Sequence, residues 1–249
     1  MTLPDFIIIG GQRCGTSSLY KYLAAHPQIA PASRKEVHYF DLNYQRGLRW
    51  YQSQFQDKQG PNMLCGEASP YYFFHPLAAQ RCASILPEVK IIVLLRDPVD
   101  RAYSHFHHEI RRGREPLSFE EALDDESERL AGQREKLLAK PLSRSLAYQS
   151  YSYQARGVYA DQLSVWMERF PREQMLILES ESIYEDSASQ YARVLAFLGL
   201  PMVDPGAYHQ WNWGVYDPML PKTRDRLTQY FRPHNQRLSE LLGMGFRWI

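Results

Sequence analysis

The sequence is poor in three features: cysteine, long hydrophobic runs and net charge. Its three cysteines, Cys14, Cys65 and Cys82, are odd in number and show no C-x-x-C spacing, so neither a disulfide framework nor a zinc site is indicated. Its longest apolar runs, such as residues 6–9 and 91–95, are far shorter than the roughly 20 residues that a membrane span needs. The 29 Lys and Arg nearly balance the 28 Asp and Glu, which argues against a nucleic-acid-binding surface.

The chain length and the first residues indicate the number of domains and the compartment. A chain of 249 residues can bury a full core without covalent staples, and no linker or internal repeat divides it, so we expect one domain over residues 1–249. Residues 1–5 lack the charged and apolar regions of a secretory signal. We therefore expect a cytoplasmic protein that acts on a small molecule, with no nucleic-acid or membrane partner. The oligomeric state is not indicated.

Apolar runs that alternate with helical patterns predict the fold class. Runs rich in β-branched residues predict buried strands at residues 5–10, 89–95 and 175–178. Helical spacing of apolar residues predicts helices over residues 16–25, 100–112 and 160–170. This alternation indicates a single α/β domain with a central, mostly parallel sheet flanked by helices.

A charged stretch interrupts this pattern at residues 111–144. Mixed charges are typical of an ordinary solvated surface, and a substrate lid is the alternative. We expect a cap over the acceptor site around residues 111–153, and we expect acceptor specificity to lie there.

The first turn of the chain has the spacing of a phosphate-binding loop. Residues 10–17 read Gly-Gly-Gln-Arg-Cys-Gly-Thr-Ser, so backbone N–H groups and a helix N-terminus can converge on an anion. A nucleoside-triphosphate loop has lysine directly after its second glycine, but Thr16 stands there and the cation is Arg13. Magnesium–triphosphate chemistry is therefore disfavoured. The alternative for this segment is a plain tight turn.

A second candidate anion site follows the strand at residues 89–95. Arg96 leaves the carboxyl end of that strand, where α/β sheets bind ligands, and Ser104 follows about two helical turns later. Both side chains could reach one phosphate. The alternative is that Arg96 pairs with Asp97 or Asp100 on the surface.

Together these segments resemble the sulfotransferases that use 3′-phosphoadenosine 5′-phosphosulfate (PAPS), above all the heparan-sulfate N- and O-sulfotransferase branch and its bacterial relatives. Residues 12–19 resemble the family's 5′-phosphosulfate loop, and residues 95–98 with 101–104 resemble its 3′-phosphate motif. Residues 35–51 are similar to the segment that carries the catalytic carboxylate. The likeness spans nearly the whole chain.

The resemblance implies a donor site and no metal requirement. It places Arg96 and Ser104 on the 3′-phosphate and, more weakly, Lys222 and Arg224 on a loop that closes over the nucleotide. The aromatic residues between 148 and 159, and Trp211 with Trp213, could stack on the adenine or line an acceptor pocket, core packing being the alternative. The residues that the resemblance places on the 5′-phosphosulfate are Arg13, Cys14, Gly15, Thr16, Ser17 and Ser18.

Two positions depart from the family pattern. Arg13 replaces the usual lysine of the 5′ loop, which retains positive charge for the leaving group but not ready proton donation. Ala68 replaces a lysine that lies near acidic acceptors in the glycan-modifying members.

The resemblance also places the general base. Glu36 matches the catalytic carboxylate of the glycosaminoglycan enzymes, and His38 is the rival because imidazole is the base in other branches. A third possibility is that neither residue acts as the base. On an extended segment the two side chains point the same way, so we expect both to line the acceptor pocket.

These observations predict a PAPS-dependent sulfotransferase acting on a hydroxyl or amine of a small metabolite. A glycan or glycolipid acceptor is the main variant. Two other classes remain open: a nucleotide kinase of shared P-loop ancestry, and a nucleotide-binding module that has lost turnover.

Overall fold

The computed structural model describes residues 2–58, 60, 62–209, 214 and 216–248. Trp211 and Trp213, the adenine-stacking candidates, lie outside the described residues. The chain forms two compact units, each built from two segments: Met1–Leu95 with Trp166–Asn212, and Arg96–Val165 with Trp213–Ile249.

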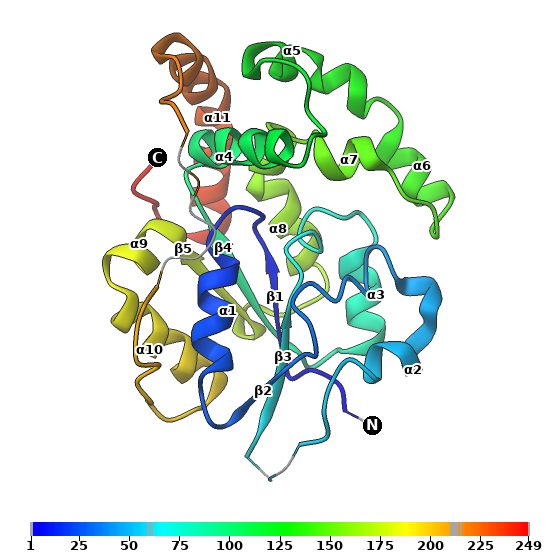
Figure 1. Ribbon diagram of the computed structural model, residues 1–249, viewed down its shortest axis with the longest axis vertical. Coiled ribbons are helices and arrows are strands. Elements are labelled where there is room, and N and C mark those ends of the chain that lie inside the picture. The colour runs from blue at the N-terminus through cyan, green and yellow to red at the C-terminus, as the bar shows by residue number, and fades with distance from the viewer. Residues whose placement is uncertain (1, 59, 61, 210–213, 215, 249) are drawn as a thin grey trace. The chain divides into compact units, whose positions relative to one another are not determined.

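The first unit contains a parallel sheet of five strands in the order β2-β3-β1-β4-β5 (Figure 1). This confirms the predicted α/β class with a central parallel sheet. The strands are β1 (Phe6–Gly10), β2 (Ile29–Pro31), β3 (Leu64–Ala68), β4 (Lys90–Leu95) and β5 (Met175–Glu179).

The sequence predicts three of these strands to within one residue and misses β2 and β3. The predicted strands are continuous apolar runs, as expected for strands covered on both faces. In contrast, β2 is only three residues long, and β3 carries Gly66 and Glu67 at its centre. Glycine is needed at position 66 for a steric reason, because a Cβ there would lie 2.1 Å from Cζ of Phe6.

Helices cover both faces of the sheet in the first unit. Helix α1 packs with α10 on one face, where Leu19, Leu23 and Val194 meet Ile8 and Ile92 of the sheet. The other face carries α2 and α3 (Figure 1). These helices are α1 (Thr16–Ala24), α2 (Gly47–Gln52), α3 (Ala78–Ile85), α9 (Ser180–Glu185) and α10 (Ser187–Leu198), with short 3-10 turns η1 (Tyr44–Arg46) and η3 (Arg172–Gln174).

The second unit is helical over its described residues. Its core joins α4, α5 and α11 through Val99, Phe106, Leu123, Leu227 and Phe231. Helix α8 (Tyr159–Met167) begins in this unit and ends in the first. The unit's own helices are α4 (Pro98–Arg111), α5 (Phe119–Leu130), α6 (Gln133–Ala139), α7 (Leu146–Ser150) and α11 (Pro221–Leu242), with the 3-10 turn η2 (Ala155–Gly157).

The charged stretch 111–144 forms α5, α6 and their connections. Helix α5 begins with a capping box, in which Ser118 and Glu121 exchange hydrogen bonds between side chain and backbone. No helix in the described ranges is long and apolar enough to cross a membrane.

Candidate functional site

The glycine-rich loop lies at the carboxyl end of β1 and leads directly into α1. Two contacts hold it against its neighbours: Gly11 N–H donates to the Leu94 carbonyl at 2.7 Å, and the Ser180 hydroxyl donates to the Cys14 carbonyl at 2.9 Å. Gly15 is the N-cap of α1 with φ 87°, and a Cβ there would lie 2.6 Å from the Tyr184 hydroxyl oxygen. Glycine is therefore required at position 15 for both conformation and space.

The side chains of this loop suit an anion more than a nucleophilic reaction. Arg13 is partly exposed and has φ 68°, while Thr16 and Ser18 are buried at the first turn of α1. That turn carries no acidic residue, so the positive end of the helix is not offset. The Cys14 side chain is fully buried, and its thiol contacts the Gln12 carbonyl at 3.7 Å. Because its side chain is fully buried, Cys14 contributes to the packing of the loop.

The segment that follows β2 carries both candidate bases, but it is not extended as predicted. Glu36 has φ 62° and His38 has φ 55°, which places both in the left-handed region. Among the described residues other than glycine, only these two and Arg13 have positive φ. Side chains disfavour this conformation, and it concentrates at functional sites where neighbouring contacts enforce it.

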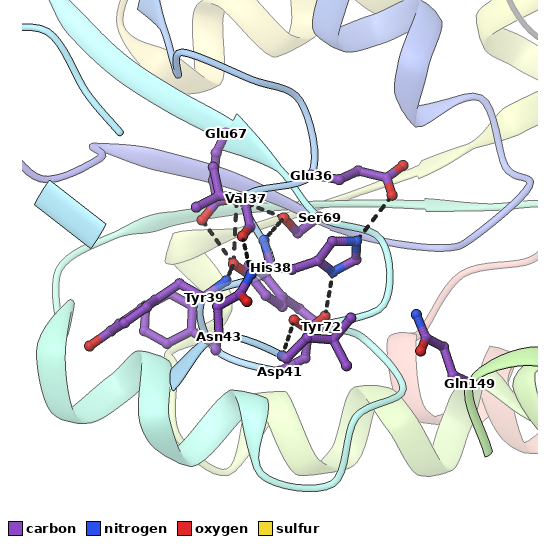
Figure 2. A network of polar contacts seen from close by, with 12 residues as sticks. Glu36, Val37, His38, Tyr39, Asp41, Asn43, Glu67, Ser69, Tyr72 and Gln149 are labelled. Atoms are coloured by element: carbon purple, nitrogen blue, oxygen red, sulfur yellow. Dashed lines mark hydrogen bonds and ion pairs between the residues drawn. The ribbon is translucent and has the colours of Figure 1, made fainter. Parts of the chain in front are cut away.

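The His38 ring lies between two carboxylates, those of Glu36 and Asp41 (Figure 2). His38 Nδ1 lies 2.8 Å from Asp41 Oδ2, and its Nε2 lies 3.2 Å from Glu36 Oε2. Asp41 is fully buried at its side chain, whereas Glu36 is 40% exposed. Lys35 donates to the other Glu36 oxygen at 2.7 Å. The row of side chains thus ends with the Glu36 carboxylate at the surface.

The electrostatics of this row separate the roles of its members. Burial alone lowers the pKa of His38, but the charge and hydrogen bonds of Asp41 and Glu36 outweigh it and raise the pKa to about 10. For Glu36, partial burial raises the pKa, but the His38 hydrogen bond and the Lys35 charge outweigh it and lower the pKa to about 2. At neutral pH the row therefore contains an imidazolium between two carboxylates.

This protonation state bears on the choice between the two candidate bases. An imidazolium that donates from both nitrogens has no lone pair left to accept a proton. The Glu36 carboxylate, in contrast, keeps lone pairs and faces solvent. The geometry gives His38 the chemistry of an orienting cation and Glu36 that of a proton acceptor.

A buried carboxyl group beside this segment is absent from the sequence-based candidates. Glu67 in β3 is fully buried and accepts hydrogen bonds from the hydroxyls of Tyr51, Ser69 and Tyr72 at 2.6, 2.7 and 3.1 Å. The signal in the sequence was a lone acidic residue inside a strand, followed by a hydroxyl residue two positions later. Only the folded structure, in which Glu67 is fully buried, shows that its side chain points into the protein.

Backbone hydrogen bonds bring the phosphate loop and the Glu36 segment to one edge of the sheet. Glu36 N–H donates to the Ala68 carbonyl at 3.0 Å, at the end of β3. Ser69 N–H, one residue later, donates to Ile8 of β1 at 3.1 Å, two residues before the glycine loop. The carboxyl ends of β1, β2 and β3 therefore present both elements, as ligand-binding α/β sheets do.

The remaining candidates belong to the second unit. Arg96 follows β4, and its carbonyl accepts from the Tyr159 hydroxyl at 2.9 Å; Ser104 is buried within α4. Lys222 is exposed at the start of α11, and Arg224 pairs with Asp100 at 2.6 Å. Asp97 caps α4 by accepting from the Val99 N–H at 2.8 Å. The first turn of α4 thus follows Arg96 directly.

In the part of the chain that the structure describes, no group of three or more His, Cys, Asp or Glu side chains has an arrangement that could hold a metal ion.

The structure thus has a glycine-rich loop after β1 and an ionised carboxylate beside a histidine after β2, an arrangement that suits an anionic ligand and a neighbouring proton acceptor. Comparison with known proteins gives the family. The sulfotransferase domain model matches residues 3–211, and the chain belongs to this family.

Three similar proteins illustrate the relationship. A sulfotransferase from Alicyclobacillus acidocaldarius, known as a crystal structure, is 32% identical, with a TM-score of 0.80 over 100% of this chain and 99% of that one. The membrane-associated sulfotransferase kil1 of Dictyostelium discoideum is 28% identical, covering 100% of this chain and 67% of that protein. The human heparan sulfate glucosamine 3-O-sulfotransferase 3B1 is 28% identical, covering 99% and 65%. The chain thus spans about two thirds of the length of these two relatives.

Proposed function

We propose that the chain transfers the sulfuryl group of PAPS to a hydroxyl or amine of an acceptor, with Glu36 as the general base. Family membership and the phosphate loop support the donor. The Glu36–His38–Asp41 row is the observation that carries the reaction, because it presents an oriented, ionised carboxylate at the edge of the sheet where the phosphate loop also lies.

The reaction is an in-line displacement at sulfur. A lone pair of the acceptor oxygen or nitrogen forms the new bond to sulfur, while the bond from sulfur to the 5′-phosphate oxygen breaks and leaves its electron pair on 3′,5′-bisphosphoadenosine. The acceptor's proton passes to Glu36. Arg13 and the amides around Gly15 stabilise the negative charge that develops on the leaving phosphate.

The low pKa of Glu36 fits a late proton transfer. A carboxylate with a pKa of about 2 is a weak base toward a free hydroxyl. Once the acceptor oxygen has begun to bond to sulfur, its proton becomes strongly acidic and a weak base suffices. The His38 imidazolium keeps Glu36 ionised and aimed, which lowers the cost of positioning.

A glycan is the second acceptor class to consider, beside the small metabolite expected from the sequence. Trp50 is partly buried, with the guanidinium of Arg46 at 4.4 Å and that of Arg34 at 5.9 Å from its ring centroid. An aromatic ring flanked by cations suits a sugar that carries carboxylate or sulfate groups. The heparan sulfate relative points in the same direction.

Calorimetric titration with 3′,5′-bisphosphoadenosine tests the donor. We expect micromolar binding with at least about tenfold preference over 5′-AMP and Mg–ATP, since Arg96 and Ser104 would read the 3′-phosphate. Arg13→Ala and Arg96→Ala should weaken binding, and Arg193→Ala, at an exposed arginine of α10, is the matched control. A preference for Mg–ATP would favour the kinase instead.

Radiolabelled PAPS with a mixed acceptor panel then tests turnover. Transfer to small hydroxylated or amine compounds would support the first acceptor class, and transfer to heparan-type oligosaccharides the second. Nucleotide binding without transfer to any acceptor would favour the hypothesis of a nucleotide-binding module that has lost turnover.

We also propose that the protein works in the cytoplasm. The three cysteines are buried as free thiols, which favours a reducing compartment. Fractionation of cells expressing the tagged protein tests this, and recovery in the membrane fraction would contradict it.

A further inference from the structure

The carboxyl group of Glu67 lies in the middle of a sheet that is covered on both faces. Glu67 lies in β3, which pairs with β1 on one side and β2 on the other, and its partner in β1 is Ile7. Its side chain is fully buried. A carboxylate at such a place is costly to desolvate unless hydrogen bonds satisfy it, and an apolar residue would serve the sheet better. Its presence calls for a role other than packing.

Three hydroxyls satisfy Glu67, and two of them also hold the segment that carries Glu36 and His38 (Figure 2). Ser69 Oγ donates to Glu67 at 2.7 Å and accepts from the His38 backbone N–H at 3.1 Å. Tyr72 Oη donates to Glu67 at 3.1 Å and accepts from the Tyr39 backbone N–H at 2.6 Å. The third hydroxyl, from Tyr51, donates to Glu67 at 2.6 Å.

The ionised carboxylate fixes the direction of these hydrogen bonds. A hydroxyl has one hydrogen, and a carboxylate can only accept. Because Ser69 and Tyr72 give their hydrogens to Glu67, their oxygens are left as acceptors toward the backbone of residues 38 and 39. This chain of bonds secures a backbone whose positive φ at Glu36 and His38 needs external support.

We infer that Glu67 is a positioning residue: through Ser69 and Tyr72 it holds the left-handed backbone at His38 and so keeps the imidazolium between Glu36 and Asp41. This inference rests on the proposed function for its effect on turnover, but its structural part does not.

The inference predicts a distinctive pH dependence. Burial raises the pKa of Glu67; the hydroxyl hydrogen bonds oppose this only partly, and the pKa is about 7. Titratable groups that act on Glu67 from the surrounding elements are Tyr20 of α1, Asp41, Tyr51 of α2, Tyr72 and Cys82 of α3. Protonated Glu67 carries a hydrogen of its own, so one hydroxyl must turn away from it. Turnover should therefore fall as the pH drops through about 7, a range in which Glu36 stays ionised.

Two tyrosines supply a matched pair of variants. Tyr51 and Tyr72 are both fully buried and both donate to Glu67, but only Tyr72 also accepts from the backbone of the Glu36 segment. We expect Tyr72→Phe to lower kcat by about tenfold or more, with bisphosphoadenosine affinity and the KM for PAPS changed less than about threefold. Loss of the Tyr51 hydrogen bond raises the pKa of Glu67, so the variants are compared above their acidic limbs; there Tyr51→Phe should lower kcat by less than about threefold, because phenylalanine keeps its stacking on Tyr39. Equal losses in the two variants would overturn the inference.

The pH dependence of kcat in Glu67→Gln provides a second test of the positioning role. We expect the acidic limb near pH 7, present in the wild type, to disappear in this variant, whose kcat should be low and level across that range. An unchanged limb in Glu67→Gln would overturn the inference, since a purely structural loss lowers kcat without moving a titration.

A readout without turnover separates this inference from the proposed function. In protein labelled with ¹⁵N-histidine, the His38 ring signals are assigned by their loss in His38→Gln. Tyr72→Phe should lower the pKa of His38 from about 10 toward its ordinary value, and Tyr51→Phe should not. If the wild type transfers no sulfuryl group, the proposed function fails and the His38 titration alone decides: equal His38 pKa values in both tyrosine variants refute the positioning role.

Discussion

Replacing Glu67 by glutamine should have opposite effects on stability and on turnover above pH 7. The pKa of Glu67 is raised from 4.5 to about 7 in the folded protein because burial penalises its charged form. Between these values the unfolded chain releases a proton that the folded chain keeps. The contribution of Glu67 to the free energy of unfolding therefore falls as the pH rises through this range and is level outside it.

The size of this contribution follows from the same interval. At about 1.4 kcal/mol per pH unit, the span from 4.5 to about 7 corresponds to about 3 kcal/mol, with no discount for solvent because the side chain is fully buried. Glutamine cannot titrate, and its amide brings two hydrogens among the three hydroxyls where the protonated carboxyl brings one, so a further buried donor lacks an acceptor, which costs about 1 kcal/mol at every pH. The variant should thus be less stable than the wild type near pH 4.5 and more stable near pH 8.

Urea unfolding of both proteins at a series of pH values tests this. The measured quantity is the difference in unfolding free energy between Glu67→Gln and the wild type, which cancels the titration of all groups that the two proteins share. We expect that difference to shift by about 3 kcal/mol in favour of the variant between about pH 4.5 and 7.5. Parallel stability curves would refute the reasoning, because they would mean that burial does not raise the pKa of Glu67.

Three further predictions concern the site. Glu36→Gln should reduce turnover by roughly 10²-fold while calorimetry finds nearly unchanged bisphosphoadenosine affinity, and full activity would pass the base role to His38 or to water. Wild-type turnover should fall as the pH rises through about 10, where His38 loses its proton, and this alkaline limb should be missing from the rate profile of His38→Gln. Gly15→Ala should destabilise the protein by about 2 kcal/mol or more in thermal unfolding, since a Cβ meets Tyr184. Gly132→Ala, at a left-handed helix N-cap in open space, should cost only about 1 kcal/mol, and equal costs would contradict the close contact.

Sequence patterns predict the sheet where burial dominates and fail where hydrogen bonding does. Strands β1, β4 and β5 are apolar runs whose composition alone requires cover on both faces. Strand β3 breaks that rule at Glu67. Its carboxyl accepts hydrogen bonds from Tyr51, which is distant in sequence, and from Tyr72, which lies in a turn. Partners of this kind are defined only by the folded chain.

The candidate site shows the same division. Loop spacing places Arg13 among the candidates, and the family resemblance adds Glu36 and His38; all three have positive φ in the structure. The extended conformation expected at Glu36 and His38 was wrong, since the tertiary hydrogen bonds that their N–H groups donate to Ala68 and Ser69 override the local preference. The pairing of His38 with Asp41 was also missed: a fixed contact three residues apart needs the turn that those bonds create.

The alternation of acid and base in residues 35–41 has a consequence for a donor that is itself multiply anionic. Two carboxylates beside a phosphosulfate would repel it, and in a site shielded from water that repulsion acts over several ångströms. Lys35 and the protonated His38 cancel the charges of Glu36 and Asp41, so this stretch of chain is electrically neutral as a whole. In the proposed reaction, this neutrality lets Glu36 stay ionised next to the anionic donor without driving the donor away.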